Sequence, residues 1–234
     1  MISSMTETGL NFCSPVYGSM EERKVGTGCF GRPFPGYEAM VVDDQDQEVP
    51  PGTVGELVLR SADPTNRRRG FMREYYKNPQ ATAKAWRSGW FHTGDYCKMD
   101  EEGRFFFVDR KKDIVRRSGE NISSMEVEAV IRSHPGVLDV AVIPVPDPLR
   151  VEEVKAYVIL KPGETPDTVP PHQIIDWCQD RFAYFKVPRY IEYRKEFPRT
   201  PTEKVQKQVL KSEKPDLAED CYDRYKDERY KRLR

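Results

Sequence analysis

The sequence predicts an α+β protein in which a β-rich first piece is followed by a smaller α+β piece. Up to Val108 the chain consists mostly of short strand-like runs separated by turn residues, with one helical stretch between them. After Lys112, helical periodicity alternates with apolar strand-like runs, which is typical of helices packed against a compact sheet. We therefore divide the chain into residues 1–111, residues 112–214 and a charged tail, residues 215–234.

The first piece is expected to be mainly β-sheet. A polar loop containing Pro50-Pro51-Gly52 separates two strand-like runs, and helix formers behind Asn78-Pro79 predict a short helix over Lys77–Trp86. The acidic turn Asp100–Gly103 then reverses the chain into an aromatic strand. The predicted strands are Tyr37–Val42, Val54–Leu59 and Arg104–Val108.

The second piece begins with a helix signal. Ser123–Glu126 is a capping-box pattern, and apolar residues recur at helical spacing from Val127 until Pro135-Gly136 ends the run. We expect the tail from residue 215 to be an exposed extension that is compatible with a helix. The other predicted elements are the strands Val137–Val145, Val154–Leu160 and Arg189–Arg194 and the helices Pro171–Phe182 and Lys204–Lys211.

Composition excludes several classes of protein. Lysine plus arginine (38) equal aspartate plus glutamate (38), so no bulk field draws the chain to nucleic acid or to a membrane surface. The five cysteines are odd in number and lack Cys-x-x-Cys spacing, which argues against a disulfide framework or a zinc site. The sequence contains no apolar run long enough for a membrane span and no signal-peptide pattern, so the expected location is the cytoplasm.

The most informative residues lie in two blocks, Trp90–Asp95 and Val108–Gly119. The predicted hairpin between them brings Asp95 and Arg110 side by side near its open end. A carboxylate that accepts hydrogen bonds from two vicinal hydroxyls is a common way to hold a ribose, and an arginine can add donors to the same diol. Thr-Gly-Asp alone is also typical of an ordinary turn, so the prediction of a nucleotide site depends on both blocks together.

In this order and at this separation, the two blocks resemble those of the AMP-forming adenylating enzymes. This superfamily includes acyl-CoA synthetases, peptide-synthetase adenylation domains and beetle luciferases. The resemblance extends from Met5 to about Lys211 and implies the end of a large adenylating domain followed by a small mobile lid domain. Four further segments carry it: Met5–Thr8, Val25–Glu38, Phe71–Thr82 and Pro198–Lys207.

The resemblance implies a reaction in two steps. A carboxylic acid first attacks the α-phosphate of ATP to form an acyl-adenylate, and a thiol, with coenzyme A favoured, then attacks that anhydride. The expected small molecules are therefore a carboxylic acid, ATP or AMP, Mg²⁺ and coenzyme A. Residue by residue, the resemblance implies Lys204 and Arg116 as catalytic, Thr6, Asp95 and Arg110 as nucleotide-binding, Glu7 as the Mg²⁺ ligand, Lys112 as the hinge and Gly119 as CoA-binding.

Lys204 suits the first step because carboxylate attack on phosphate brings like charges together, and a positioned cation stabilises them. The family usually has glycine before this lysine, whereas here Glu203 stands there. A non-glycine residue resists positive φ, and the added carboxylate could pair with Lys204. The chain also has Ser3-Ser4 where the family has an aromatic residue that stacks on adenine, followed by glycine.

The family's phosphate loop and most of its acyl pocket are expected upstream of the Thr-Glu motif, and this sequence does not contain them. The favoured interpretation is the C-terminal segment of an acyl-CoA synthetase, close to crotonobetaine/carnitine-CoA ligase-like enzymes and inactive or weakly active alone. A separate chain carrying the upstream part is one expected partner. Two alternatives stay open: an adenylation module for a carrier protein, and a non-catalytic remnant acting as an interaction or regulatory module.

Overall fold

The computed structural model describes residues 6–8, 13–14 and 27–233. The chain divides into two compact units, Met1–Lys112 and Asp113–Arg234, which we call the first and the second unit. Residues 215–234 belong to the second unit and do not form a separate tail. The Ser3-Ser4 pair lies outside the described residues.

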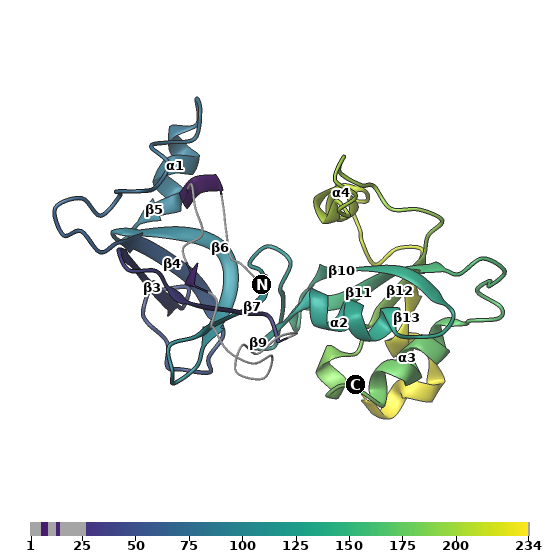
Figure 1. Ribbon diagram of the computed structural model, residues 1–234. Helices are drawn as coiled ribbons and strands as arrows, with labels where there is room; N and C mark the ends of the chain where they lie inside the picture. The colour runs from purple at the N-terminus through teal and green to yellow at the C-terminus, as the bar shows by residue number, and fades with distance from the viewer. Residues whose placement is uncertain (1–5, 9–12, 15–26, 234) are drawn as a thin grey trace. The chain divides into compact units, whose positions relative to one another are not determined.

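The described part of the first unit forms one antiparallel seven-stranded sheet in the order β1-β2-β7-β6-β4-β3, with β5 paired to β6 (Figure 1). Asn78 begins the helix as predicted, because its side-chain oxygen accepts a hydrogen bond from the Ala81 amide at 3.0 Å. The strands are β1 (Cys13–Ser14), β2 (Cys29–Pro33), β3 (Tyr37–Val42), β4 (Gly55–Ser61), β5 (Trp86–Arg87), β6 (Trp90–Met99) and β7 (Phe105–Arg110), and the helices are η1 (Thr6–Thr8) and α1 (Pro79–Ala85).

The largest buried cluster of apolar residues described in the first unit packs against this sheet. Phe30, Val41, Leu57, Leu59 and Phe105 come from four strands and are almost completely buried. Burying such a side chain contributes about 1.5–3 kcal/mol relative to leaving it in water. These residues, with Cys97 of β6, anchor β2, β3, β4, β6 and β7, so these strands can carry functional groups at their ends.

Within the described residues the second unit forms a six-stranded sheet in the order β13-β12-β11-β8-β9, with β10 paired to β11. Strands β11 and β12 run parallel, and the other pairs are antiparallel. The strands are β8 (Val115–Arg117), β9 (Glu120–Ile122), β10 (Val137–Asp147), β11 (Val151–Leu160), β12 (Tyr190–Tyr193) and β13 (Tyr222–Asp223). The helices are α2 (Ser124–Arg132), α3 (Pro171–Gln179), η2 (Tyr184–Lys186), α4 (Lys207–Ser212), η3 (Arg224–Lys226) and η4 (Glu228–Leu233).

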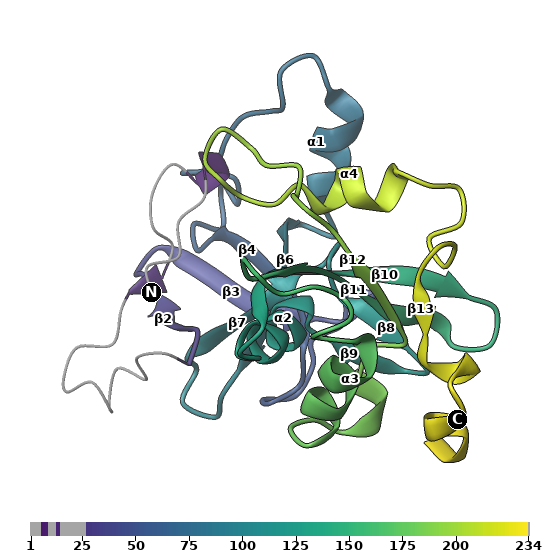
Figure 2. The same cartoon turned by 90° about the vertical axis from the view of Figure 1, so that its right-hand side faces the viewer.

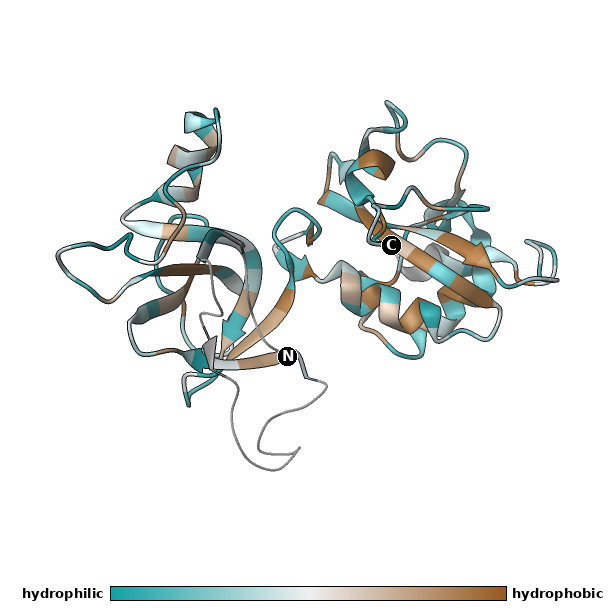
Figure 3. Ribbon diagram, turned by 45° about the horizontal axis from the view of Figure 1, so that its top comes forward, coloured by the Kyte–Doolittle hydropathy of each residue, from teal (hydrophilic) through white to brown (hydrophobic). Residues whose placement is uncertain are grey.

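Both faces of this second sheet are covered. Val140 and Val142 of β10 pack with α2 and α3 on one face, whereas Ala141 and Ile143 face the cluster that contains Leu210 of α4. This alternation follows from the two-residue period of a strand. Figure 2 shows α3 and α4 on opposite sides of β11 and β12, and Figure 3 shows hydrophobic residues concentrated in the strands.

Two predictions about this unit were wrong. The segment after residue 214 is packed and not exposed: β13 pairs with β12, Tyr230 is 4% exposed, and the carbonyl of Leu217 accepts a hydrogen bond from the buried Lys155 at 2.6 Å. Aromatic and apolar residues of this segment contribute to the core of the second unit. The many charged residues of the segment had suggested that it would be exposed. The last predicted helix begins at Lys207 and not at Lys204, because the Gln206 amide bonds to the Pro198 carbonyl and holds residues 204–206 in a hairpin.

The beginning of α2 agrees with the sequence. The Ser123 hydroxyl accepts a hydrogen bond from the Glu126 amide at 3.2 Å, as an N-cap does. The carboxylate of Glu126 is bonded to Lys186 at 2.7 Å. No helix in the described ranges is long and apolar enough to span a bilayer.

Candidate functional site

Asp95 and Arg110 lie directly opposite each other on β6 and β7. Their side chains meet, with 2.9 Å between Nε of Arg110 and Oδ1 of Asp95. The hairpin predicted from the sequence therefore brings these two residues together, as expected. The register shifts just beyond this pair, between Tyr96 and Cys97. Such a bulge bends the strand and redirects side chains, and bulges are frequent next to functional sites.

The described residues only partly offset the cost of burying the carboxylate of Asp95. Its side chain is 18% exposed, and Oδ1 accepts no well-aligned hydrogen bond from any described residue, although Arg110 is close. Burial raises the pKa of Asp95, Arg110 opposes this, and the nearby carboxylates of Glu7 and Asp109 raise the pKa further. Donors supplied by a bound molecule would therefore stabilise this group.

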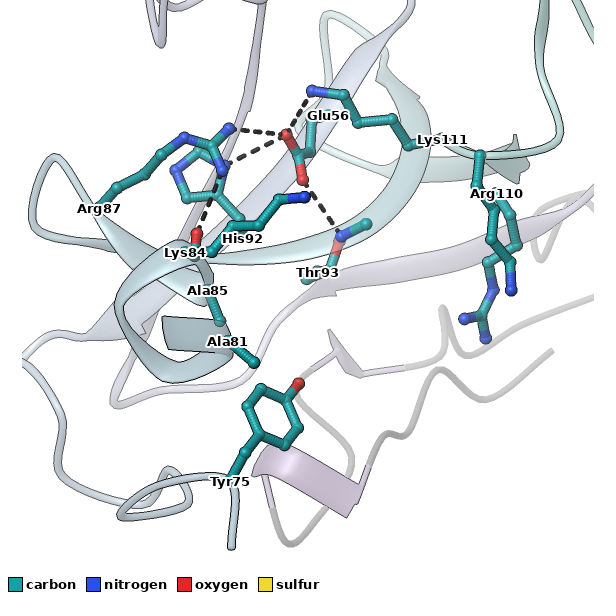
Figure 4. A pocket seen from close by; sticks show the side chains of 12 residues that line it. Glu56, Tyr75, Ala81, Lys84, Ala85, Arg87, His92, Thr93, Arg110 and Lys111 are labelled. Atoms are coloured by element: carbon teal, nitrogen blue, oxygen red, sulfur yellow. Dashed lines mark hydrogen bonds and ion pairs between the residues drawn. The ribbon is translucent and has the colours of Figure 1, made fainter. Parts of the chain in front are cut away.

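A cavity of about 570 Å³ lies beside the pair in the first unit. Its wall includes Thr93 and Gly94, which precede Asp95, together with Arg110, Lys111 and Lys112. Figure 4 shows Glu56 on this wall with Arg87, His92 and Lys111 turned toward it, while Tyr75 lies on the opposite side. The cavity is thus rich in cations and has one deeply buried carboxylate.

Glu56 is bonded on both of its carboxylate oxygens. Oε1 accepts a hydrogen bond from the Gly94 amide at 3.2 Å, and Oε2 lies 2.9 Å from Nζ of Lys111 and 3.1 Å from Nη2 of Arg87. Nδ1 of His92 is 3.2 Å from the same Oε2. Burial opposes ionisation, but contacts with His92 and Lys111 outweigh it and lower the pKa of Glu56 to about 2. Glu56 is therefore ionised at neutral pH.

Glu7 lies in the short turn η1, which begins at Thr6, and it is near enough to Asp95 for its charge to raise the pKa of that carboxyl. Oε1 of Glu7 accepts a hydrogen bond from the Tyr75 hydroxyl at 3.1 Å. In the part of the chain that the structure describes, no three His, Cys, Asp or Glu side chains come together as a metal site. A cation next to Glu7 would therefore take one protein carboxylate and draw its other ligands from substrate and water, which suits Mg²⁺.

Lys204 lies in the second unit at the end of a tight turn. The Thr200 amide donates to the Lys204 carbonyl at 2.8 Å, and the guanidinium of Arg199 donates to the Glu203 carbonyl at 2.8 Å. Glu203 has φ of 62°, so this position does require the left-handed conformation that glycine would adopt without strain. Lys204 is exposed, and no described side chain, Glu203 included, forms an ion pair with it.

Arg116 and Gly119 belong to a two-stranded hairpin of the second unit, formed by β8 and β9. Arg116 lies opposite Asn121, and its amide donates to Glu152 at 2.7 Å. Ser118 and Gly119 have φ of 50° and 89°, the backbone of a two-residue hairpin turn. The turn itself explains the glycine.

Lys112 is the last residue of the first unit, and the residues on either side of it are bonded within their own units. Lys111 pairs with Glu56 at 2.9 Å, and Asp113 pairs with Lys211 at 3.0 Å. Of the predicted site residues, Asp95, Arg110 and Glu7 therefore gather in the first unit. Lys204, Arg116 and Gly119 belong to the second.

Sequence reasoning did not identify Glu56, Lys111 or His92 as site residues. His92 is buried, with 3% of its side chain exposed, but it lines the cavity and contacts Glu56. A single glutamate within the otherwise apolar run Gly55–Leu59 was the available signal, because a buried charge requires partners.

Comparison with known proteins gives consistent matches in both units. Residues 126–204 match the family described as "AMP-binding enzyme C-terminal domain", and residues 4–76 match the family "AMP-binding enzyme". A crotonobetaine/carnitine–CoA ligase from Proteus mirabilis (strain HI4320) is 43% identical over 181 residues, which are 77% of this chain and 34% of the relative. The chain thus spans about a third of the length of the curated relatives it matches.

Solved structures agree with these matches. The anthranilate CoA ligase AuaEII in complex with anthranoyl-AMP aligns with a TM-score of 0.71 and 33% identity, covering 90% of this chain and 38% of that one. The o-succinylbenzoate CoA synthetase of Bacillus subtilis, in complex with its acyl-adenylate intermediate, aligns with a TM-score of 0.72 and 27% identity, covering 90% and 40%.

Proposed function

The chain belongs to the AMP-forming adenylating enzymes, and we propose that it serves as the C-terminal segment of an ATP-dependent carboxylic acid–CoA ligase. The names of its relatives support a thioester-forming reaction, and the bound adenylates of its structural neighbours support an acyl-adenylate intermediate. The order of steps is acid plus ATP to acyl-adenylate and pyrophosphate, then thiol plus acyl-adenylate to thioester and AMP.

The observation that carries this proposal is the Asp95–Arg110 pair. Asp95 is mostly buried, its pKa is raised by that burial, and its Oδ1, although 2.9 Å from Nε of Arg110, accepts no well-aligned hydrogen bond within the described residues. Two vicinal ribose hydroxyls would donate to this carboxylate, while Arg110, 59% exposed, can turn its remaining N–H groups toward the same sugar or a phosphate. The pair is thus suited to the ribose of a nucleotide and not to a free carboxylic acid, which Asp95 would repel.

Lys204 would act in the first step. It is exposed and free of ion pairs with described residues, so its full charge is available to the acyl oxygen and the α-phosphate as they approach. The hydrogen bonds at Thr200 and Glu203 hold the backbone of its turn. When bound, Mg²⁺ would neutralise phosphate charge, with Glu7 as its carboxylate ligand and Thr6 as a hydroxyl contact for the phosphate.

Arg116 and Gly119 would act in the second step, where the thiol sulfur attacks the acyl carbon, the bond from that carbon to the phosphate oxygen breaks, and AMP leaves. Space beyond Gly119 is open, so an extended arm such as pantetheine can approach its backbone. The change in orientation of the second unit between the two steps would take place by a change in backbone conformation at Lys112, where the two units join in the chain.

Isothermal titration of the folded chain with AMP and with 2′,3′-dideoxy-AMP tests the nucleotide site. A hydrogen bond to a charged group contributes about 1.5–3 kcal/mol, so we expect AMP to bind at least about tenfold more tightly than the dideoxy nucleotide. Asp95→Asn should reduce this preference, because a neutral amide oxygen is a weaker acceptor than a carboxylate, and Asp63→Asn, which alters a loop carboxylate in the same unit, should preserve it. Failure of the folded wild-type chain to bind AMP would refute the proposal and favour a non-catalytic interaction module.

A further inference from the structure

We propose that Glu56 is a positioning residue for the nucleotide site, because it bonds to the amide of Gly94 in β6 and to Nζ of Lys111, the residue that follows β7. The inference rests on the proposed function, since it assigns to Glu56 the task of setting the geometry of a ribose-binding pair. No ligand contact is required of Glu56 itself.

Backbone pairing alone does not fix the geometry of Asp95. Strand β6 pairs regularly with neither of its neighbours here: its register with β4 shifts between Glu56 and Val58, and its register with β7 shifts between Tyr96 and Cys97. At bulges the ladder is interrupted and extra residues are left without cross-strand partners. Side-chain bonds can therefore add to the interrupted backbone ladder in holding this end of β6.

Glu56 supplies those bonds from the adjacent strand β4. Its Oε1 bonds to the amide of Gly94, the residue immediately before Asp95, and its Oε2 bonds to Nζ of Lys111, the residue immediately after Arg110. The Lys111 amide also donates to the Gly94 carbonyl at 2.8 Å. One carboxylate thus bridges the two chain segments next to the pair (Figure 4).

The charge of Glu56 is what makes this bridge strong. The side chain is 4% exposed, so its bonds to Lys111 and Arg87 are little screened by solvent. A neutral amide of the same shape can still accept from the Gly94 amide, but its NH₂ group would face Lys111, Arg87 and His92. The Lys111 side of the bridge would then be lost, and Arg110 would be held opposite Asp95 less firmly, by backbone pairing alone.

A carboxylate that only stabilised the fold would produce a different result from a positioning residue. Removing it would lower the unfolding temperature but leave the nucleotide affinity of the remaining folded protein unchanged. A positioning residue changes the affinity of protein that is still folded, because sub-ångström displacement of binding groups is costly. Nucleotide affinity measured well below the unfolding temperature therefore separates the two roles.

The experiment titrates AMP into the wild-type chain and into Glu56→Gln, Lys111→Met, Lys111→Arg and the control Glu38→Gln. Glu38 also binds two cations, Arg60 and Arg67, in the first unit, but it lies away from the Asp95–Arg110 pair on β3. We expect Glu56→Gln and Lys111→Met to weaken AMP binding by about tenfold or more. Lys111→Arg should retain the cation and most of the affinity, and Glu38→Gln should bind like the wild type.

The outcomes are distinguishable. Wild-type affinity in both Glu56→Gln and Lys111→Met overturns the inference and leaves the proposed function intact. An equal loss in Glu38→Gln also overturns it, because the effect would then be general destabilisation. No AMP binding by the folded wild type overturns the proposed function and this inference together. If Glu56→Gln does not fold, the contrast between Lys111→Met and Lys111→Arg decides.

Discussion

Acid should destabilise the first unit through Glu56, and this effect can be isolated. The pKa of Glu56 is lowered from its ordinary value of 4.5 to about 2, which corresponds to about 3 kcal/mol of stability at 1.36 kcal/mol per unit. Because the folded pKa lies below the unfolded one, this stability is present above about pH 4.5 and is lost as the pH falls toward 2.

Between pH 6 and pH 3 the wild type should lose about 2 kcal/mol through this residue alone. Glu56→Gln cannot titrate, so its unfolding free energy should fall by that much less over the same interval. Glu38→Gln is the matched comparison. Arg60 and Arg67 lower the pKa of Glu38 against the opposing effect of burial, but over a third of its side chain is exposed and solvent screens the effect.

The measurement is urea unfolding at pH 6 and pH 3, followed by tryptophan fluorescence. Trp86 and Trp90 report on the first unit, and Trp177→Phe removes the tryptophan of the second unit from the signal. A separate signal is needed because two units need not unfold together. Parallel pH profiles for the wild type and Glu56→Gln would show that Glu56 is not the buried, ion-paired carboxylate described above, and the reasoning would be refuted.

Two further predictions concern the Lys204 turn. Glu203→Gly should raise the unfolding free energy of the second unit by up to about 1 kcal/mol, because it relieves a non-glycine residue at φ of 62°, and a lower unfolding temperature would contradict this. Lys204→Gln should change the unfolding free energy by less than about 0.5 kcal/mol, since no described group forms an ion pair with this exposed side chain. The same substitution should sharply reduce acyl-adenylate formation when it is made in an active enzyme that contains this segment. A large loss of stability in Lys204→Gln would mark the residue as structural.

Local signals in the sequence determined much of the fold. The α2 helix begins where the Ser123 pattern predicts, β3 covers Tyr37–Val42 as expected, and the hairpin around Gly103 pairs Asp95 with Arg110. These features depend on contacts between residues close in the chain, such as caps, turns and strand alternation. Patterns of adjacent residues report such contacts directly.

Only the tertiary structure decided what surrounds the pair. Glu56 meets Gly94 and Lys111 across 38 and 55 residues of chain, and Lys155 reaches Leu217 across 62. The sequence offers many oppositely charged residues that could pair with Glu56, and many segments against which residues 215–233 could pack. Only the folded structure determines which of these contacts form. Local patterns therefore identified the carboxylate and the arginine of the candidate site, whereas long-range packing determined which groups hold them there, because a buried charge is stable only where the whole fold brings its partners to it.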